Sequence, residues 1–273
     1  MTTAATPFPI EVSLMKTANF MARGRQHRGV LRDGMLIDAA GEAHHPDEVQ
    51  FLLPVNPGKV IALALNYADH NAELGFKTPE EPVMFLKPNT SLLPHGGTVE
   101  YPRGAQFMHY EVELGIVIGK RSSYLKKEQA KSAIAGYFLS NDVSERVFQI
   151  ERAGQWTKGK SYDTFGPVGP WLVTADEVKD PQKLHLWLEL NGKRVQDGTT
   201  ATMVFGVAHI VAYLSQFFTL MPGDIITTGT PPGVGMGIKP EPVFLKAGDV
   251  MTLGIEKLGE QRQDVIAWRR REA

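Results

Sequence analysis

Three acidic residues have the types and the spacing that could hold a metal ion. Glu111 and Glu113 are separated by one residue, so on a β-strand both side chains point to the same face. Two carboxylates that close repel each other unless a cation lies between them. Asp142 is predicted to end another strand and could converge on the pair, and three carboxylates suit Mg²⁺, Mn²⁺ or Ca²⁺, which prefer oxygen ligands. From spacing alone the alternative, a pair of solvated glutamates on an exposed strand, stays open.

A second group of residues could supply acid–base chemistry. His70 and Glu73 are three residues apart on a predicted helical turn, so the carboxylate can orient the imidazole as a general base. Lys160 could neutralise a substrate carboxylate or a developing oxyanion. The alternatives are a surface histidine near a helix start and a solvated loop lysine, and the residues by themselves leave these open.

Residues 154–161 match the phosphate-binding pattern G-x-x-x-x-G-K-[ST]. Such a loop must follow a buried strand and open a helix. Residues 145–152 are instead charged and helix-like, and Pro167 and Pro170 prevent a helix afterwards. The context therefore argues against nucleotide binding. Another alternative for the whole chain is a non-catalytic carbohydrate- or protein-binding β domain. It predicts that the acidic residues can be neutralised without functional loss.

Composition narrows the class of protein further. The chain has 273 residues, of which 42% are apolar and 22% charged, as in ordinary soluble domains. There is no cysteine, which excludes disulfides, thiolate nucleophiles and cysteine-ligated zinc. The net charge is −1 with no basic tract, so we expect no nucleic-acid partner. No stretch approaches the roughly twenty apolar residues of a membrane span, and residues 1–10 lack the pattern of a secretory signal, so we expect a cytoplasmic protein with no membrane partner.

The elements that must position these residues are mostly strands. Apolar runs and period-two alternation predict strands, and apolar residues three and four apart predict helices. The strands are expected at residues 60–65, 82–85, 109–119, 184–190 and 225–228, with a short one reaching 141–142. The helices are expected at 126–137 and 204–218, with a short helix or loop at 66–75. Asn191 and Gly192 indicate a hairpin turn after the strand at 184–190.

The chain is predicted to divide into two unequal parts. Residues 11–39 contain short apolar runs broken by glycines, typical of a small β-rich unit, and residues 51–57 carry two prolines and look like a connector. The expected domains are 1–57, a small N-terminal domain with its connector, and 58–273, the catalytic domain.

The strings that carry these residues resemble the fumarylacetoacetate hydrolase superfamily. The matching strings, which occur in the family's order over roughly residues 58–268, are Asn66-Tyr67-Ala68-Asp69-His70, Phe85-Leu86-Lys87-Pro88, Tyr110-Glu111-Val112-Glu113-Leu114, Asn141-Asp142-Val143-Ser144, Lys158-Gly159-Lys160, Asp163-Thr164-Phe165-Gly166-Pro167, Gly223-Asp224 and Thr228-Gly229-Thr230-Pro231.

The resemblance implies an α+β, mainly β fold, a mixed β-sandwich roll, usually in a homodimer with a divalent metal ion such as Mg²⁺. It also implies roles for individual residues. The implied metal ligands are Glu111, Glu113 and Asp142, the catalytic residues His70, Glu73 and Lys160, and the substrate-binding residues Tyr67, Gln155 and Thr230. Residues 70–82 resemble a lid that orders over bound ligand.

The resemblance further implies a small 2-oxo acid as substrate. Residues 155–173, 191–196 and 229–239 are most similar to hydrolases of 2,4-diketo-3-deoxy sugar acids, which are acylpyruvates. We therefore predict a metal-dependent hydrolase that cleaves a carbon–carbon bond of a 2,4-dioxo acid, releasing pyruvate and a second acid. Residues 66–82 are equally similar to the homoprotocatechuate isomerase/decarboxylase. The alternative is therefore an isomerase or decarboxylase of an unsaturated 2-oxo-diacid, or an oxaloacetate decarboxylase.

Overall fold

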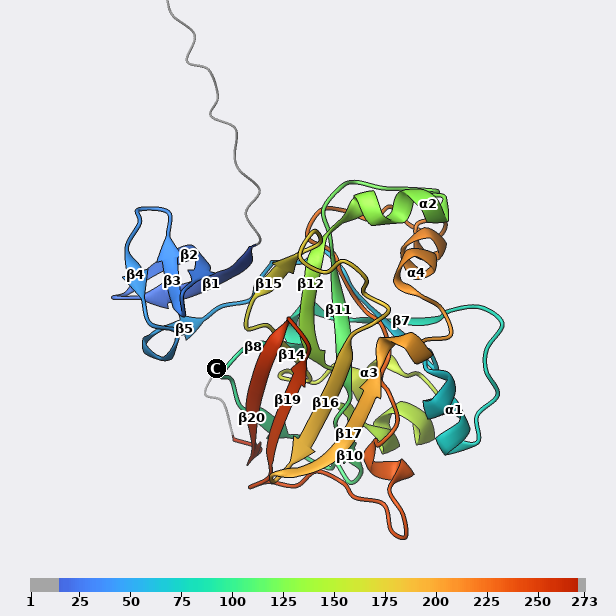
Figure 1. Ribbon diagram of the computed structural model, residues 1–273. Helices are drawn as coiled ribbons and strands as arrows, with labels where there is room; N and C mark the ends of the chain where they lie inside the picture. The colour runs from blue at the N-terminus through green and yellow to red at the C-terminus, as the bar shows by residue number, and fades with distance from the viewer. Residues whose placement is uncertain (1–14, 270–273) are drawn as a thin grey trace, which may run out of the picture.

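The computed structural model describes residues 15–269 and shows a small N-terminal unit beside a larger β-sandwich (Figure 1). The expectation about residues 1–10 lies outside the described residues. The N-terminal unit consists of β1 (Lys16–Ala22), β2 (Arg25–Arg32), β3 (Met35–Asp38), β4 (Ala43–His44) and β5 (Gln50–Phe51), with a 3₁₀ turn at Pro46–Glu48. This confirms the predicted β-rich start of the chain. The division into domains 1–57 and 58–273 stays a prediction.

One large mixed sheet runs through both parts of the molecule. Its order is β4-β3-β2-β1-β15-β12-β11-β18-β6-β7, with β5, β8 and β14 attached beside this path. The strands of the main part are β6 (Val60–Ala64), β7 (Val83–Lys87), β8 (Leu92–Pro94), β11 (Val112–Ile118), β12 (Ile134–Asn141), β14 (Gly166–Val168), β15 (Leu172–Thr174) and β18 (Ile225–Thr227). The pairing of β1 with β15 joins the N-terminal unit to the main sheet.

A five-stranded sheet packs against the large one and closes the sandwich. Its order is β17-β16-β19-β20-β9, and a separate short pair joins β10 to β13. The bounds are β9 (Val99–Tyr101), β10 (Met108–His109), β13 (Ser144–Glu145), β16 (His185–Leu190), β17 (Lys193–Thr199), β19 (Val250–Ile255) and β20 (Gly259–Ala267). Leu114 and Ile116 of β11 share one buried cluster with Leu188 of β16 and Leu253 of β19, so the main core lies between the two sheets.

The helices are short and lie at the margins of the sandwich (Figure 1). They are α1 (Ala68–Leu74), α2 (Lys127–Ala130), α3 (Thr157–Lys160) and α4 (Val207–Leu214), together with a π-helical turn at Val147–Glu151 and 3₁₀ turns at Asn89–Ser91, Lys131–Ala133, Thr200–Thr202 and Gly235–Gly237. The fold is therefore mainly β, as predicted.

The long helix predicted over residues 126–137 is wrong. Helical structure ends at Ala133, and Ile134 already begins β12. β12 pairs with β11 along its whole length and with β15 near its start. At Gly136 an added Cβ would lie 2.2 Å from the carbonyl oxygen of Val173, so β15 packs too close for any larger side chain at this position. Pairing with distant strands therefore outweighed the local helical pattern.

The other elements differ from prediction mainly at their ends. The helix predicted at 204–218 is α4, which begins only after Gly206 and ends at Leu214. The strands at 60–65 and 225–228 are confirmed to within one residue as β6 and β18. The predicted hairpin joins β16 to β17, and Asn191 and Gly192 both have positive φ, 53° and 76°, as a type I′ turn requires.

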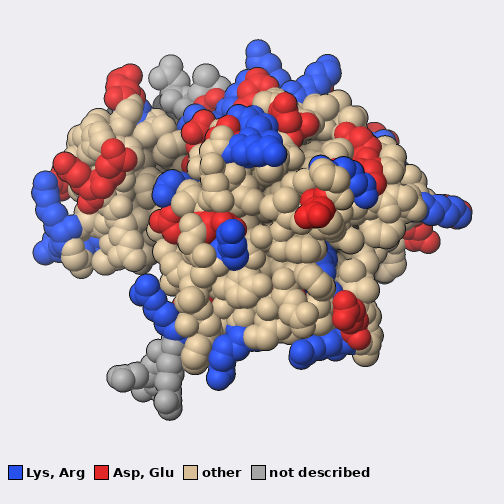
Figure 2. Space-filling view, turned by 90° about the horizontal axis from the view of Figure 1, so that it is seen from below, with Lys and Arg blue, Asp and Glu red and all other residues tan. Residues whose placement is uncertain are grey.

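On the face seen from below in Figure 2, basic and acidic side chains are interspersed. Among the described residues, no helix is both long enough and apolar enough to span a membrane.

Candidate active site

The pairing of β11 with β12 brings the three predicted metal ligands together. Val112 is opposite Asn141, so Glu111 and Asp142 follow at the same end of the two strands, where the Asp142 amide donates to the Glu111 carbonyl at 2.9 Å. Glu113 is two residues after Glu111, within β11, and its side chain lies on the same face. Carboxylate oxygens of Glu111, Glu113 and Asp142 all lie within 4.8 Å of one another, and all three residues are buried.

Basic side chains surround two of these carboxylates. The Lys160 ammonium donates to Glu111 and to Asp142, both at 2.7 Å. Lys87 donates to the other oxygen of Asp142 and, at 3.0 Å, to the carbonyl of Phe165. Arg146 donates to Glu111 and, at 2.6 Å, to Gln149. Each of these contacts is shielded from water, so each is stronger than a surface ion pair.

The carboxylates differ in their electrostatic surroundings. Burial alone would raise the pKa of Glu111, but Lys160 and Arg146 outweigh burial and hold that pKa below its usual range. Burial, reinforced by the charges of Asp142 and Glu111, raises the pKa of Glu113 well above its usual value. Glu113 is therefore the carboxylate whose charge the protein itself compensates least.

This imbalance fits a bound cation. Glu113 accepts a hydrogen bond from the Gly229 amide at 2.9 Å. Among the described residues, no lysine, arginine or histidine lies within 4 Å of its carboxylate. A divalent ion beside Glu113 would stabilise its ionised form, and the three converging carboxylates are the hard oxygen donors that Mg²⁺ and Mn²⁺ prefer. The residues present therefore fit a divalent metal ion.

The predicted general base and its partner are in contact. His70 Nδ1 lies 3.3 Å from the Glu73 carboxylate, and both residues are on α1. Glu73 is held in turn by the Gly233 amide, at 3.0 and 3.1 Å from its two oxygens. An added Cβ at Gly233 would lie 1.9 Å from the Val195 carbonyl oxygen, so only glycine lets this amide approach. A carboxylate only accepts hydrogen bonds, so Nδ1 carries the proton and Nε2 is left with a lone pair that can accept one.

Several of the ionisable side chains described above line one small pocket of about 70 Å³. His70, Glu111, Glu113, Arg146 and Lys160 form its polar side. Its other walls are largely apolar, formed by Leu63, Ala64, Leu65, Leu74, Phe76, Ile150, Trp156 and Met236. A ligand with an anionic, oxygen-rich end and a less polar remainder would match this division.

The predicted substrate-binding residues are placed unequally. Thr230 lines the pocket, but its hydroxyl already donates to the Val112 carbonyl and accepts from the Gln196 amide, both at 2.9 Å, so it has no proton left to donate to a ligand. Tyr67 is fully buried, and burial together with the Glu113 charge raises its pKa well above the usual value. Gln155 is exposed and does not line the pocket, because it precedes α3, in which only Gly159 and Lys160 are buried. The structure thus does not bring Gln155 to the site.

Three residues of the site were not singled out from the sequence. Lys87 and Arg146 contact the carboxylates, and Gln149 lines the pocket beside Arg146. A signal for Lys87 existed, since it shares the inward face of β7 with Phe85. The apolar Leu86 between them favours the opposite face, and it is 50% exposed in the structure. The orientation of β7 was therefore not readable from its residues.

The surroundings of Lys160 also argue against a phosphate-binding loop at residues 154–161. Residues 154–161 follow the π-helical turn at Val147–Glu151, and α3, which has only four residues, lies within them instead of after them. Since the Lys160 ammonium is occupied by two carboxylates, this segment has neither the flanking elements nor the free lysine of a nucleotide site.

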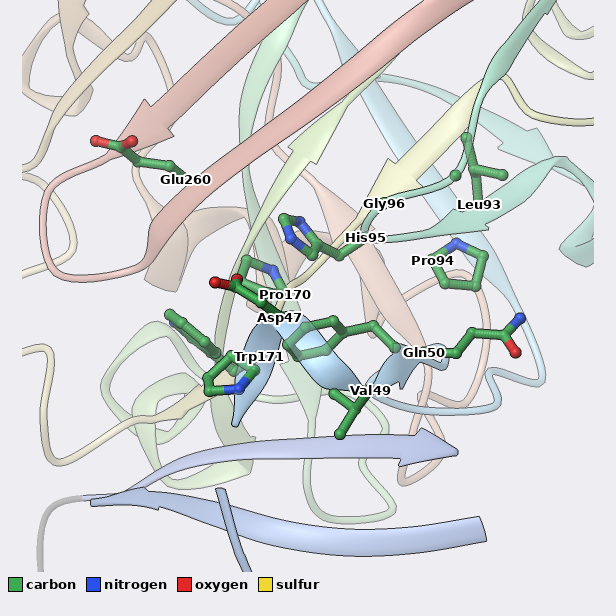
Figure 3. A pocket seen from close by; sticks show the side chains of 13 residues that line it. Asp47, Val49, Gln50, Leu93, Pro94, His95, Gly96, Pro170, Trp171 and Glu260 are labelled. Atoms are coloured by element: carbon green, nitrogen blue, oxygen red, sulfur yellow. The ribbon is translucent and has the colours of Figure 1, made fainter. Parts of the chain in front are cut away.

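A second hollow, of about 730 Å³, lies between the N-terminal unit and the sandwich (Figure 3). Phe51, His95 and Trp171 are among its lining residues, and none of the three predicted metal ligands reaches it. The smaller pocket is the better candidate for chemistry, because only there do ionised side chains converge.

Comparisons with known proteins match most of the chain. The family model described as fumarylacetoacetate (FAA) hydrolase C-terminal matches residues 59–266. A Burkholderia cenocepacia protein, named as an unproven hydrolase without a substrate, is 59% identical over 206 residues, which are 76% of this chain and 73% of that protein.

Solved structures share the fold as well. A 2-hydroxyhepta-2,4-diene-1,7-dioate isomerase from Mycobacterium marinum is 32% identical with a TM-score of 0.82, over 94% of this chain and 100% of that one. A fumarylpyruvate hydrolase from Pseudomonas aeruginosa, in complex with Mn²⁺ and pyruvate, is 32% identical with a TM-score of 0.71, over 80% of this chain and 92% of that one.

Proposed function

Because this chain belongs to the fumarylacetoacetate hydrolase family, we propose that it is a metal-dependent enzyme that hydrolyses a carbon–carbon bond of an acylpyruvate. The products are pyruvate and a second carboxylic acid. The observation that carries the proposal is that His70, which contacts Glu73, lines the same pocket as Glu111 and Glu113, whose carboxylates meet that of Asp142. Either group alone would suit many reactions, but together they provide a place for an anionic 2-oxo acid beside a base.

Glu111, Glu113 and Asp142 would hold the divalent ion. Such an ion supplies Lewis-acid stabilisation for negative charge on the oxygens of a 2-oxo acid. The name of the fumarylpyruvate hydrolase structure, which holds Mn²⁺ and pyruvate, supports this assignment. Mg²⁺ is the physiological ion we propose, with Mn²⁺ and Ca²⁺ as the alternatives of the same oxygen-preferring class.

His70 acts as the general base in this proposal. Its Nε2 takes a proton from water while the water oxygen adds to the C4 carbonyl of the substrate. The C3–C4 bond then breaks, its electron pair remains on C3, and the proton held by His70 is available to convert the enolate into pyruvate. Glu73 stabilises the imidazolium that forms, and the Gly233 amide fixes the orientation of Glu73.

Lys160 offsets negative charge that develops on the substrate. Asp142 and Glu111 hold the ammonium in place and raise the pKa of Lys160 against the opposing effect of burial. The lysine therefore stays charged at neutral pH and needs no reorganisation during the reaction, which makes a fixed charge effective in catalysis.

The alternative is isomerisation or decarboxylation of an unsaturated 2-oxo-diacid. It is favoured by the isomerase name of one structural neighbour that covers 94% of this chain. The same carboxylates and the same lysine would serve, since both reactions pass through an enolate. Water would not add to the substrate, and His70 would instead move a proton between carbon atoms.

Pyruvate release from a panel of acylpyruvates tests the proposal. The panel runs from short alkyl acylpyruvates to a 2,4-diketo-3-deoxy sugar acid, each assayed with Mg²⁺ and with chelator. We expect metal-dependent release, fastest for the alkyl substrates because the pocket wall is apolar. In ¹⁸O-water the new carboxylate should carry solvent oxygen. Isomerised or decarboxylated product without pyruvate would contradict hydrolysis and support the alternative.

The substitution His70→Ala separates the base from the metal ligands. We expect kcat to fall by about 10²–10⁴, the usual contribution of a general base. Mg²⁺ affinity, measured by calorimetric titration, should stay unchanged. Weakened Mg²⁺ binding would contradict the role, because it would make His70 a ligand.

We also propose that the chain forms a homodimer, as the family resemblance suggests. Light scattering after gel filtration measures the mass directly, and a single monomeric species at micromolar concentration would contradict the proposal.

A further inference from the structure

Two histidines and an aspartate meet in the N-terminal unit, far in the fold from the carboxylates of the pocket. His27 is on β2, Asp38 ends β3 and His44 is on β4. In the pairing of these strands, Gly29 is opposite Asp38 and Leu36 is opposite His44. His27 is two residues from Gly29, and Asp38 is two from Leu36, so all three side chains lie on one face of the sheet.

The side chains point toward one another. One carboxylate oxygen of Asp38, Oδ2, lies 2.8 Å from His27 Nδ1 and 3.2 Å from His44 Nε2. The other oxygen, Oδ1, accepts from the amides of Ala40 and Glu42, both at 2.9 Å. These hydrogen bonds, with that of Glu42 the most important, lower the pKa of Asp38 to about 2, so the carboxylate is ionised at neutral pH.

We propose that His27, Asp38 and His44 form a second metal site, which takes Zn²⁺ or a similar divalent transition-metal ion and clips three adjacent strands together. One ligand atom from each residue lies within 4.8 Å of the other two. Four ligands at about 2.1 Å from a tetrahedral ion stand roughly 3.4 Å apart. The contacts of 2.8 and 3.2 Å thus need to open by only a few tenths of an ångström to admit the ion.

The donor set selects the class of ion. Imidazole nitrogen suits Zn²⁺ and its neighbours in the first transition series, whereas Mg²⁺ and Ca²⁺ prefer all-oxygen sites. The Oδ1 hydrogen bonds from Ala40 and Glu42 are the outer-shell contacts that fix a ligating carboxylate in position. The site therefore differs in kind from the carboxylate cluster of the pocket.

The surroundings favour a structural role. Phe20 stacks on His27 with ring centroids 5.5 Å apart and meets His44 edge-on at 5.1 Å, which leaves a reactant no room on that side. The His27 side chain is 19% exposed and the other two are 5% exposed, so an ion can enter past His27 but is then shielded. Such a site stabilises the strands that supply its ligands.

The N-terminal unit has a reason to need such a clip. Its separate core has few fully buried members, namely Ala18, Phe20, Ala22, Leu36 and Phe51. Units this small bury too little apolar surface to be stable without help, and a structural metal is one common form of it. An ion shared by β2, β3 and β4 would tie these three strands to one another, beside β1, which pairs with the sandwich sheet at β15.

Zinc retention by the full-length protein tests the proposal. Protein freed of metal by chelator is incubated with Zn²⁺, passed through gel filtration in excess Mg²⁺, and its zinc measured by mass spectrometry. The Mg²⁺ competes at the oxygen ligands of the pocket. We expect the wild type and Glu113→Gln to keep one zinc ion that His27→Gln and His44→Gln lose. Zn²⁺ affinity by calorimetry should fall by more than about 100-fold, the upper end of the effect of losing an outer-shell partner.

Two further variants guard against misfolding and accident. His45→Gln changes a neighbouring histidine that is half exposed and contacts Asp47 instead, and it should keep the zinc. Asp38→Asn preserves an acceptor for the Ala40 and Glu42 amides, so it should fold and yet lose the zinc. Zn²⁺ should also slow amide hydrogen exchange over residues 25–44 in the wild type but not in Asp38→Asn or His27→Gln. Equal zinc in the wild type, Asp38→Asn and His27→Gln, or none in the wild type, would overturn the proposal.

Discussion

The two groups of three potential ligands show how differently one chain can arrange ionisable side chains. At the pocket, Glu111, Glu113 and Asp142 converge through oxygen atoms alone, and basic residues contact Glu111 and Asp142. In the N-terminal unit, His27 and His44 flank the single carboxylate of Asp38. The two groups have the same number of ligands and comparable spacing, so spacing by itself does not reveal what a cluster does.

Donor chemistry and local charge distinguish them. The pocket keeps a carboxylate, Glu113, whose pKa burial and its acidic neighbours raise, which makes it dependent on a cation for its ionised form. Asp38 needs no cation, because backbone amides and the two histidines already stabilise its charge. The first arrangement suits an ion that takes part in catalysis. The second suits an ion that holds strands together.

The strongest test of this comparison alters one site at a time and measures the properties of both. Glu113→Gln should reduce pyruvate release to the background rate, because the cluster loses a ligand that the proposed chemistry requires. The same variant should keep the proposed N-terminal zinc. Initial rates and zinc content, measured on one preparation, check both halves.

The reverse exchange is the matched control. His44→Gln should lose the zinc but retain at least half of the wild-type kcat, since its strand contributes nothing to the pocket. A variant of either kind that abolished both properties would show that the two clusters depend on each other.

The next largest effect concerns stability. Lys87 is 2% exposed and pairs with Asp142, so Lys87→Met leaves a buried carboxylate with one cation fewer and the Phe165 carbonyl without its donor. Removing one partner of a buried ion pair costs about 3–5 kcal/mol. Urea unfolding of the metal-free protein measures the loss.

An exposed ion pair near the N-terminal cluster provides the contrast. Arg23 pairs with Glu42, and their side chains are 76% and 42% exposed. Arg23→Met should change the free energy of unfolding by no more than about 1 kcal/mol. Similar losses in the two variants would mean that burial does not set the value of the pocket's ion pairs.

The smallest expected effect is the acid response of Asp38. Its pKa in the folded protein, about 2, is below the ordinary value of 3.8, so the unfolded chain binds the proton more tightly. The carboxylate therefore stabilises the fold fully above about pH 4, and this contribution is lost as the pH falls from about 4 to 2.

Circular dichroism during acid titration, in chelator, checks this response. The wild type should lose its stability advantage over Asp38→Asn in that window. A constant difference between the two proteins from pH 5 to pH 2 would contradict it.

Much of the site could be predicted because its signals are local. The alternation around Glu111 and Glu113 indicated their shared face, and the three-residue spacing of His70 and Glu73 indicated their contact, which the structure places at 3.3 Å. The hairpin at Asn191 and Gly192 was equally local, since only such residues readily adopt two successive positive φ angles. Asp142 and Lys160 were also candidates from the residues alone, and the resemblance to a known family then implied their roles.

The failures have a common cause in distant contacts. The helical pattern over residues 126–137 was real but gave way to a strand that pairs with β11 and β15. Gln155 was placed near the substrate by resemblance, while Gln149, six residues earlier, lines the pocket. Gln149 lies in the π-helical turn and Gln155 in the exposed segment after it, and nothing local marks which of the two faces the pocket.

The sequence by itself determined the predominance of strands, the types of catalytic groups, the absence of thiol chemistry and the family. Each of these depends on residue type or on neighbours within a few positions. Only the tertiary structure decided that Lys87, Arg146 and Lys160 contact the carboxylates of Glu111 and Asp142, and that His27, Asp38 and His44 meet on one sheet face. Such meetings depend on strand register and order, which are fixed by the burial of whole faces and leave little trace in any single segment.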